Sequence, residues 1–335
     1  MKEPIGHDVI RSQLRAMAPS NANPTPLAHA WLFAGPTGVG KFAIARWWAA
    51  VLKCPEGGNC QPVCESCRLV AGGVHPDVFE TGPAPKDKSA VQSVDVEIER
   101  KKSVGIEESR ALIQRLSLRP TRPGPRIAIV REAGSMTVPA QNALLKLLEE
   151  PPGSAVIILV TDNVGAMIVT VRSRCRHLAF GTLSQGEVHR VLLAQGWTDD
   201  EALAAAACAR GSVARALTMS SEGLVEREQL LLAWEGLRRS PDDVEGLIAA
   251  LVARKSQGYG LGDLLEWQLA KVEASLGREV AEPSAELTRI LGEARSLATP
   301  PQIANAERIR RTMGEIARNV NARLAIRDLL INVRV

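Results

Sequence analysis

Short, fully apolar runs alternate with longer amphipathic stretches through the first 180 residues. Runs such as Ile127 to Val130 and Ala155 to Val160 are typical of strands that are buried on both faces. Strands of this kind that alternate with helices predict a parallel sheet covered by helices on both sides. The expected strands lie at 31–34, 77–80, 127–130, 155–160 and 177–180, and the expected helices lie at 8–17, 41–53, 105–118 and 139–150.

The strand pattern ends near residue 181, and helical spacing replaces it. Short helices are expected at 187–193, 201–208 and 213–219, followed by core-spaced Leu230, Leu231, Trp234 and Leu237 and a long closing segment at 304–333. A chain of 335 residues is too long for one ordinary core. We therefore expect an α/β domain over residues 1–181, a small helical domain over 182–221 and an all-α domain over 222–335.

Composition and charge exclude some classes of protein. Lys and Arg number 41 and Asp and Glu number 37, so the charge of +4 neither requires nor excludes a nucleic-acid partner. Aromatic residues make up only 3% of the chain, which disfavours a stand-alone module that stacks nucleic-acid bases. Because the sequence has no basic-then-apolar leader and no apolar run near the ~20 residues of a membrane helix, we expect a cytoplasmic protein.

A glycine-rich turn follows the first expected strand and ends in lysine: Gly35-Pro-Thr-Gly-Val-Gly-Lys41. Its candidate phosphate-binding residues are Gly35, Gly38, Gly40 and Lys41. In such loops backbone N–H groups surround phosphate oxygens and the lysine reaches the terminal phosphates. A chance glycine turn is the alternative, but the order of strand, turn, lysine and helix favours a phosphate-binding loop, with ATP or ADP binding left open.

Both usual protein ligands of a catalytic magnesium ion are replaced in this chain. Phe42 stands where a serine or threonine hydroxyl binds Mg²⁺, and Arg131 stands where the strand at 127–130 would end in aspartate. A phenyl ring donates nothing to a metal, and a guanidinium repels it. We therefore expect no Mg²⁺ here. Glu132 keeps the position of the catalytic base, although a solvated carboxylate at a strand end explains it equally well.

Four of the six cysteines, Cys54, Cys60, Cys64 and Cys67, fall within fourteen residues. Four thiolates are the ligand set of a closed, structural zinc site, and the surrounding prolines and glycines suit its tight turns. Unligated core cysteines are the alternative, but they would not gather in a segment rich in Pro, Gly, Asn and Gln. We predict one structural Zn²⁺ bound within residues 54–67.

These motifs together resemble the bacterial DNA polymerase III clamp-loader family. The resemblance rests on the loop at 35–41, the four cysteines, His75-Pro-Asp77, Asn142 to Pro152 and Ser173-Arg174-Cys175. It covers residues 1 to about 220. Within the family the chain resembles the delta-prime subunit more than the gamma/tau ATPase subunit, because Phe42, Arg131 and Ala214 depart from the ATPase pattern.

The resemblance implies an AAA+ fold, in which 1–181 is the P-loop domain, 182–221 a helical lid and 222–335 a helical collar. It implies a hetero-pentameric ring with gamma/tau and delta subunits, which places a sliding clamp on primed DNA at the replisome. It also implies that Arg174 is an arginine finger, which reaches the nucleotide of a neighbouring subunit. A surface arginine, in a strand where Arg172, Arg174 and Arg176 alternate, is the alternative.

Three functional hypotheses follow from the sequence. The leading one is a clamp-loader subunit that does not hydrolyse ATP itself but supplies Arg174 to a neighbour within the polymerase assembly. The second is an active ATPase subunit of the gamma/tau type, which Lys41 and Glu132 favour and Phe42 and Arg131 disfavour. The third is a zinc-bearing nucleic-acid-binding module. The charged stretch 82–103, expected to be a mobile surface loop, and the individual DNA-contacting residues have no assigned role.

Overall fold

The chain divides into two compact units, Met1–Leu183 and Ser184–Val335. The computed structural model describes residues 2–18, 27–83, 103–219, 227–232, 235, 261–276, 280, 282, 284–295, 307–309 and 311. Within those residues, no helix combines the length and the apolar character needed to cross a bilayer.

The first unit is built on a five-stranded, wholly parallel sheet in the order β2-β3-β4-β1-β5. The strands are β1 (Ala30–Ala34), β2 (Val78–Thr81), β3 (Ile127–Val130), β4 (Val156–Thr161) and β5 (Arg176–Ala179). In this order β1 lies between the central strand β4 and the edge strand β5, so the loop after β1 begins at the carboxyl edge of the sheet, beside the end of β4. Ligands of open parallel sheets bind at that edge.

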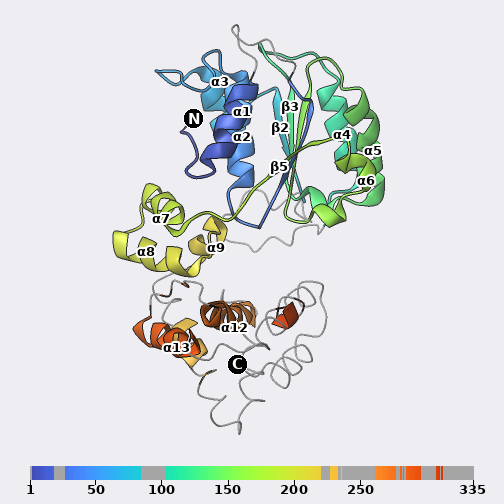
Figure 1. Cartoon of the computed structure of the whole chain (residues 1–335). Helices are drawn as coiled ribbons and strands as arrows, with labels where there is room; N and C mark the ends of the chain where they lie inside the picture. The colour runs from blue at the N-terminus through green and yellow to red at the C-terminus, as the bar shows by residue number, and fades with distance from the viewer. Residues whose placement is uncertain are drawn as a thin grey trace, which may run out of the picture. The chain divides into compact units, whose positions relative to one another are not determined.

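Helices cover both faces of the sheet (Figure 1), with α1, α2 and α3 on one side and α4, α5 and α6 on the other. Their bounds are α1 (Asp8–Met17), α2 (Lys41–Lys53), α3 (Glu65–Ala71), α4 (Ile106–Leu116), α5 (Val138–Glu149) and α6 (Val169–Arg172). Side chains of successive strand residues point to opposite faces of the sheet. Trp31 and Phe33 pack with α2 in one core, and Leu32 packs with α5 in the other.

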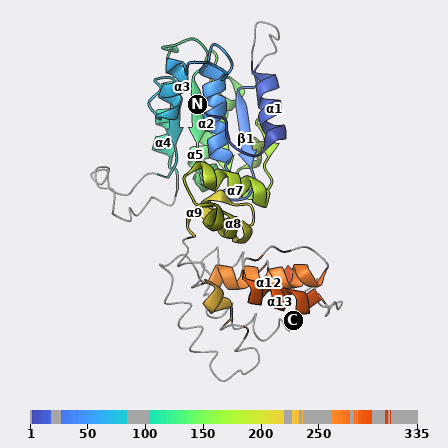
Figure 2. The same ribbon diagram turned by 90° about the vertical axis from the view of Figure 1, so that its left-hand side faces the viewer.

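The described part of the second unit is helical. Three short helices, α7 (Gln185–Ala194), α8 (Asp199–Cys208) and α9 (Val213–Leu217), pack on one another. A capping box fixes the start of α7, because Ser184 accepts from the Glu187 N–H and Glu187 accepts from the Ser184 N–H. Further along, α12 (Leu261–Ser275) and α13 (Ala285–Arg295) lie side by side (Figure 2) and bury Trp267 with Leu230 and Leu231.

The fold class expected from the sequence is confirmed, namely a parallel five-stranded α/β domain followed by helices. Each expected strand differs from the observed one by at most one residue at either end. Helix α3 was not expected. The proposed strand alternation of three arginines is wrong, because Arg172 ends α6 and only Arg176 belongs to β5.

Several expectations fall outside the described residues: most of the stretch 82–103, Trp234, Leu237 and the closing segment 304–333 apart from 307–309 and 311. The domain boundary expected at residue 221 also falls outside the described residues, because residues 220–226 are not described. The division of the second unit into lid and collar therefore stays a prediction.

Candidate functional site

The glycine loop leaves the carboxyl end of β1 and enters α2 directly. Gly35 must be glycine, because a Cβ there would lie 2.3 Å from the Phe180 carbonyl oxygen. Gly38 (φ 78°) and Gly40 (φ 94°) take left-handed conformations that favour glycine, and Gly40 is the N-cap of α2. The loop thus directs the free N–H groups at the start of a thirteen-residue helix toward one place.

Lys41 is tied to its own loop. Its buried Nζ donates hydrogen bonds to the carbonyl oxygens of Gly35 at 2.7 Å and Pro36 at 2.6 Å. Burial lowers the pKa of Lys41, and the charge of Asp162 acts in the opposite direction. Asp162 also accepts a hydrogen bond of 2.6 Å from the Thr37 hydroxyl, which links the loop to the end of β4.

The two residues predicted from the sequence to replace magnesium ligands, Phe42 and Arg131, are in contact. The Arg131 guanidinium carbon lies 5.3 Å from the centroid of the Phe42 ring. That of Arg46 lies 5.7 Å from the same centroid, and Arg46 is also ion-paired with Glu80 at 2.7 Å. Cations near an aromatic face are attracted by its quadrupole. Two guanidinium groups thus lie within about 6 Å of the centre of the Phe42 ring, at the place where the sequence pattern would put the oxygen ligands of a metal.

The four cysteines predicted as metal ligands come together. Their Sγ atoms all lie within 4.8 Å of one another, and two of the distances are 3.7 Å (Cys60 to Cys67) and 3.8 Å (Cys54 to Cys64). A tetrahedral ion with Zn–S bonds of about 2.3 Å holds its sulfurs about 3.8 Å apart. The residues present therefore fit a four-thiolate zinc site, and all four are free thiols.

Local structure directs each sulfur inward. Cys54 follows the last residue of α2, Cys64 is the N-cap of α3, and Cys67 lies in the first turn of α3. Cys60 Sγ accepts from the Cys64 N–H, which lowers the pKa of Cys60 to about 7, whereas burial raises the pKa of Cys67. Backbone N–H groups aimed at sulfur stabilise thiolate, the form that binds a metal.

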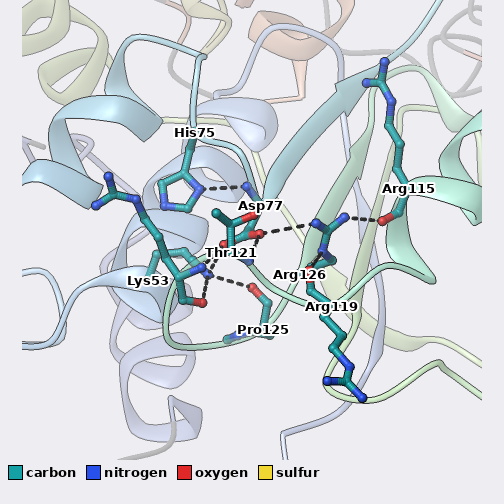
Figure 3. A network of polar contacts seen from close by, with 9 residues as sticks. Lys53, His75, Asp77, Arg115, Arg119, Thr121, Pro125 and Arg126 are labelled. Atoms are coloured by element: carbon teal, nitrogen blue, oxygen red, sulfur yellow. Dashed lines mark hydrogen bonds and ion pairs between the residues drawn. The ribbon is translucent and has the colours of Figure 1, made fainter.

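A buried polar network supports the cysteine module (Figure 3), and its centre is Asp77. This fully buried carboxylate accepts hydrogen bonds from Lys53 Nζ (3.0 Å), the Thr121 N–H (2.7 Å) and the Arg122 N–H (2.9 Å). Burial by itself raises the pKa of Asp77, but these donors outweigh burial and lower it. The Asp77 N–H donates in turn to Nδ1 of His75.

The network joins the cysteine module to the loop that leads into β3. Lys53 directly precedes Cys54, and its ammonium also donates to the carbonyl oxygens of Arg122 and Pro125. Glu65, directly after Cys64, forms an ion pair with Arg122 at 2.8 Å. From the sequence, Asp77 was identified as part of a motif but was assigned no role, because its backbone partners Thr121 and Arg122 are 44 and 45 residues away.

Replacing Asp77 by asparagine is expected to lower the free energy of unfolding at pH 7 by about 2 kcal/mol, a value within the range for hydrogen bonds to a charged group. The amide still accepts one hydrogen bond, but Lys53 and Arg126 lose their buried counter-ion. Because the pKa of Asp77 is lowered by folding, its contribution is complete above the unfolded value of about 3.9 and is lost as pH falls below it. Urea denaturation of both proteins should therefore give curves that converge in acid.

Arg174 lies in the tight turn between α6 and β5. Cys175 points into the second core and is buried, whereas the Arg174 side chain is 35% exposed. Its Nη1 donates to the Thr170 carbonyl oxygen at 2.8 Å, and its Nη2 is 2.6 Å from a carboxylate oxygen of Glu149. Arg176, two residues later, has other surroundings, since its guanidinium carbon lies 5.3 Å from the centroid of the Trp31 ring.

The family model described as "DNA polymerase III, delta subunit" matches residues 11–184, which is more than half of the chain. The matched region contains the glycine loop, the four cysteines, the Asp77 network and Arg174.

Curated relatives agree with this match. The DNA polymerase III subunit delta' of Pseudomonas aeruginosa is 35% identical over 150 residues, 44% of this chain and 42% of that protein. The gamma/tau subunit of Mycobacterium bovis is 35% identical over 170 residues, 50% of this chain and 26% of that protein. The matches thus span less than half of either relative. The RuvB branch migration motor of Thermotoga maritima aligns with a TM-score of 0.42 at 17% identity, over 88% of this chain and 85% of that chain.

Proposed function

The chain belongs to the DNA polymerase III delta-subunit family, and from this membership we propose that it is a clamp-loader subunit that does not hydrolyse ATP itself. In the proposed assembly it joins gamma/tau and delta subunits in a five-membered ring in the cytoplasm, which loads the sliding clamp onto primed DNA. It supplies Arg174 to the nucleotide of a neighbouring subunit. The delta' and gamma/tau relatives support this class of complex.

The contact between Arg131 and Phe42 is the observation that best supports the proposal that this chain does not hydrolyse ATP. Phosphoryl transfer in P-loop enzymes depends on Mg²⁺ held by a hydroxyl and a carboxylate of the protein. At these two positions this chain has a phenyl ring and a guanidinium group 5.3 Å apart. Restoring a metal ligand at only one of these two positions leaves the other position without one. The metal is therefore held only when both Phe42 and Arg131 are changed.

The opposite candidate is an active ATPase of the gamma/tau type. The intact glycine loop, the buried Lys41 and the relatedness to a gamma/tau subunit favour it. Steady-state ATP turnover by the purified chain, freed of contaminating ATPases, separates the two functions. We expect background turnover, and robust magnesium-dependent turnover by the unmodified chain would favour the ATPase.

The double variant Phe42→Thr/Arg131→Asp is expected to raise magnesium-dependent ATP turnover by about tenfold or more over the unmodified chain. A bound metal supplies several kcal/mol of transition-state stabilisation, although Ala214 still stands where the ATPase subunits carry an arginine. Phe42→Thr alone retains the repelling guanidinium, and Arg131→Asp alone retains a ring that cannot bind a metal. Each single variant should therefore stay at background, and equal gains from singles and double would contradict this account.

Reconstitution tests the proposed function as a whole. The purified chain is mixed with the other clamp-loader subunits of its host, and the mixture is assayed for a stable complex and for loading of the clamp onto primed DNA. A chain that neither joins the complex nor supports loading would refute the proposal. Salt-dependent binding of the isolated chain to bare DNA tests the remaining hypothesis, a zinc-bearing nucleic-acid-binding module.

A further inference from the structure

We propose that Glu149 is a positioning residue, whose carboxylate holds the Arg174 guanidinium in the orientation that reaches the nucleotide of a neighbouring subunit. The inference rests on the proposed function of Arg174. Its basis is the contact of 2.6 Å between Arg174 Nη2 and Glu149 Oε1, made together with the 2.8 Å hydrogen bond from Nη1 to the Thr170 carbonyl oxygen. Two fixed groups on different helices thus hold the two terminal nitrogens of one side chain.

Both holding groups belong to rigid elements. Glu149 is the last residue of α5, whose inner face is buried in the second core, and Thr170 lies in the short helix α6. The two helices are joined by Gln141, a buried α5 residue with 1% exposure. Its amide oxygen accepts from the Ile168 N–H at 2.8 Å, and its amide nitrogen donates to the Ala166 carbonyl oxygen at 3.0 Å.

The arrangement leaves Arg174 able to bind an anion. A guanidinium carries five N–H donors, of which Glu149 and Thr170 take one each. Three donors remain, and the side chain is 35% exposed. An ion pair this exposed is weak. It can therefore favour one orientation of the guanidinium and still leave the arginine able to bind a phosphate, which carries more charge than a carboxylate. Glu149 therefore acts through Arg174 and need not touch the nucleotide.

The neighbouring glutamate provides a matched control. Glu150 has the same carboxylate one residue later, but it is the C-cap of α5 with a different backbone conformation, and Arg174 pairs with Glu149 instead. Glutamine at 149 keeps an acceptor oxygen in the same place and removes only the charge. Alanine at 149 removes both the acceptor and the charge.

The test uses the reconstituted complex with each variant of this subunit and measures DNA- and clamp-stimulated ATP hydrolysis. Misplacing a catalytic group by about 1 Å costs up to ~10²-fold at its own site. Because one of several sites is affected, Glu149→Ala is expected to lower kcat of the complex about 3- to 10-fold, with KM for ATP little changed. Glu149→Gln should recover most of that rate, and Glu150→Ala should match the wild type.

A purely structural role for Glu149 would instead alter melting or assembly, and glutamine would recover no kcat. In the Arg174→Ala background, Glu149→Ala should have no further effect on the rate. Full or raised activity of Glu149→Ala, together with slow hydrolysis by Arg174→Ala, would overturn the inference and leave the proposed function intact. Full activity of Arg174→Ala itself would overturn both.

Discussion

Replacing Cys67 by serine is expected to abolish zinc binding and to lower the free energy of unfolding by more than about 4 kcal/mol, the range reached when a structural metal is lost. Cys67 is fully buried, and the ion would join the end of α2 to the start of α3 through four sulfurs. Structural zinc contributes its binding energy to folding. Metal analysis of the wild type should give one zinc per chain.

The comparison of chelated and untreated proteins makes this test specific. A chelator should lower the Tm of the wild type toward that of Cys67→Ser and should leave the variant unchanged. Cys208→Ala is the control, because Cys208 is buried in the second unit, far along the chain from the cysteine module. Its Tm should fall moderately and stay chelator-sensitive. Well under one zinc per wild-type chain, purified without chelators, would refute the metal site.

The strands and the cysteine cluster were predictable because both signals are local. Ile127 to Val130 and Val156 to Val160 are apolar throughout, so their length and burial follow from the residues themselves. Four cysteines within fourteen residues, in a segment rich in proline and glycine, are a local pattern typical of one structural metal site. Helix α3 was missed because its N-cap is Cys64, whose Sγ accepts from the Cys67 N–H, and not one of the usual capping residues Ser, Thr, Asp or Asn.

The remaining features depend on contacts between distant segments. The Asp77 network joins positions 44 and 45 residues apart, and the ion pair of Arg174 with Glu149 joins the turn after α6 to the end of α5. Phe42 and Arg131 were each interpreted from the sequence as replacing a metal ligand. Only the fold shows that the Arg131 guanidinium carbon lies 5.3 Å from the centroid of the Phe42 ring. Spacing along a chain predicts which residues share a face of one element, and it does not predict side-chain pairs across elements.

Arg174→Ala is expected to leave the subunit folded and the complex assembled, and to slow its DNA- and clamp-stimulated ATP hydrolysis. The side chain is 35% exposed and its partner Glu149 is 50% exposed, so the loss of their ion pair should cost at most about 1 kcal/mol of stability. An arginine finger can be worth ~10³ or more in rate at its own site. In the proposed ring the other sites would keep their own arginines, so the steady-state loss should be smaller and should depend on coupling between sites.

Nearby arginines distinguish a finger from a generic basic surface. Arg172→Ala and Arg176→Ala each remove one positive charge within two residues, but Arg172 ends α6 and Arg176 is stacked on Trp31. A basic surface predicts three similar, small effects on hydrolysis, whereas a finger predicts a large effect for Arg174 alone. Arg174→Lys should recover only part of the rate, since an ammonium keeps the charge but loses the planar, two-pronged set of donors. Wild-type rates for Arg174→Ala in an intact, clamp-loading complex would show that this guanidinium does not reach a neighbour's nucleotide.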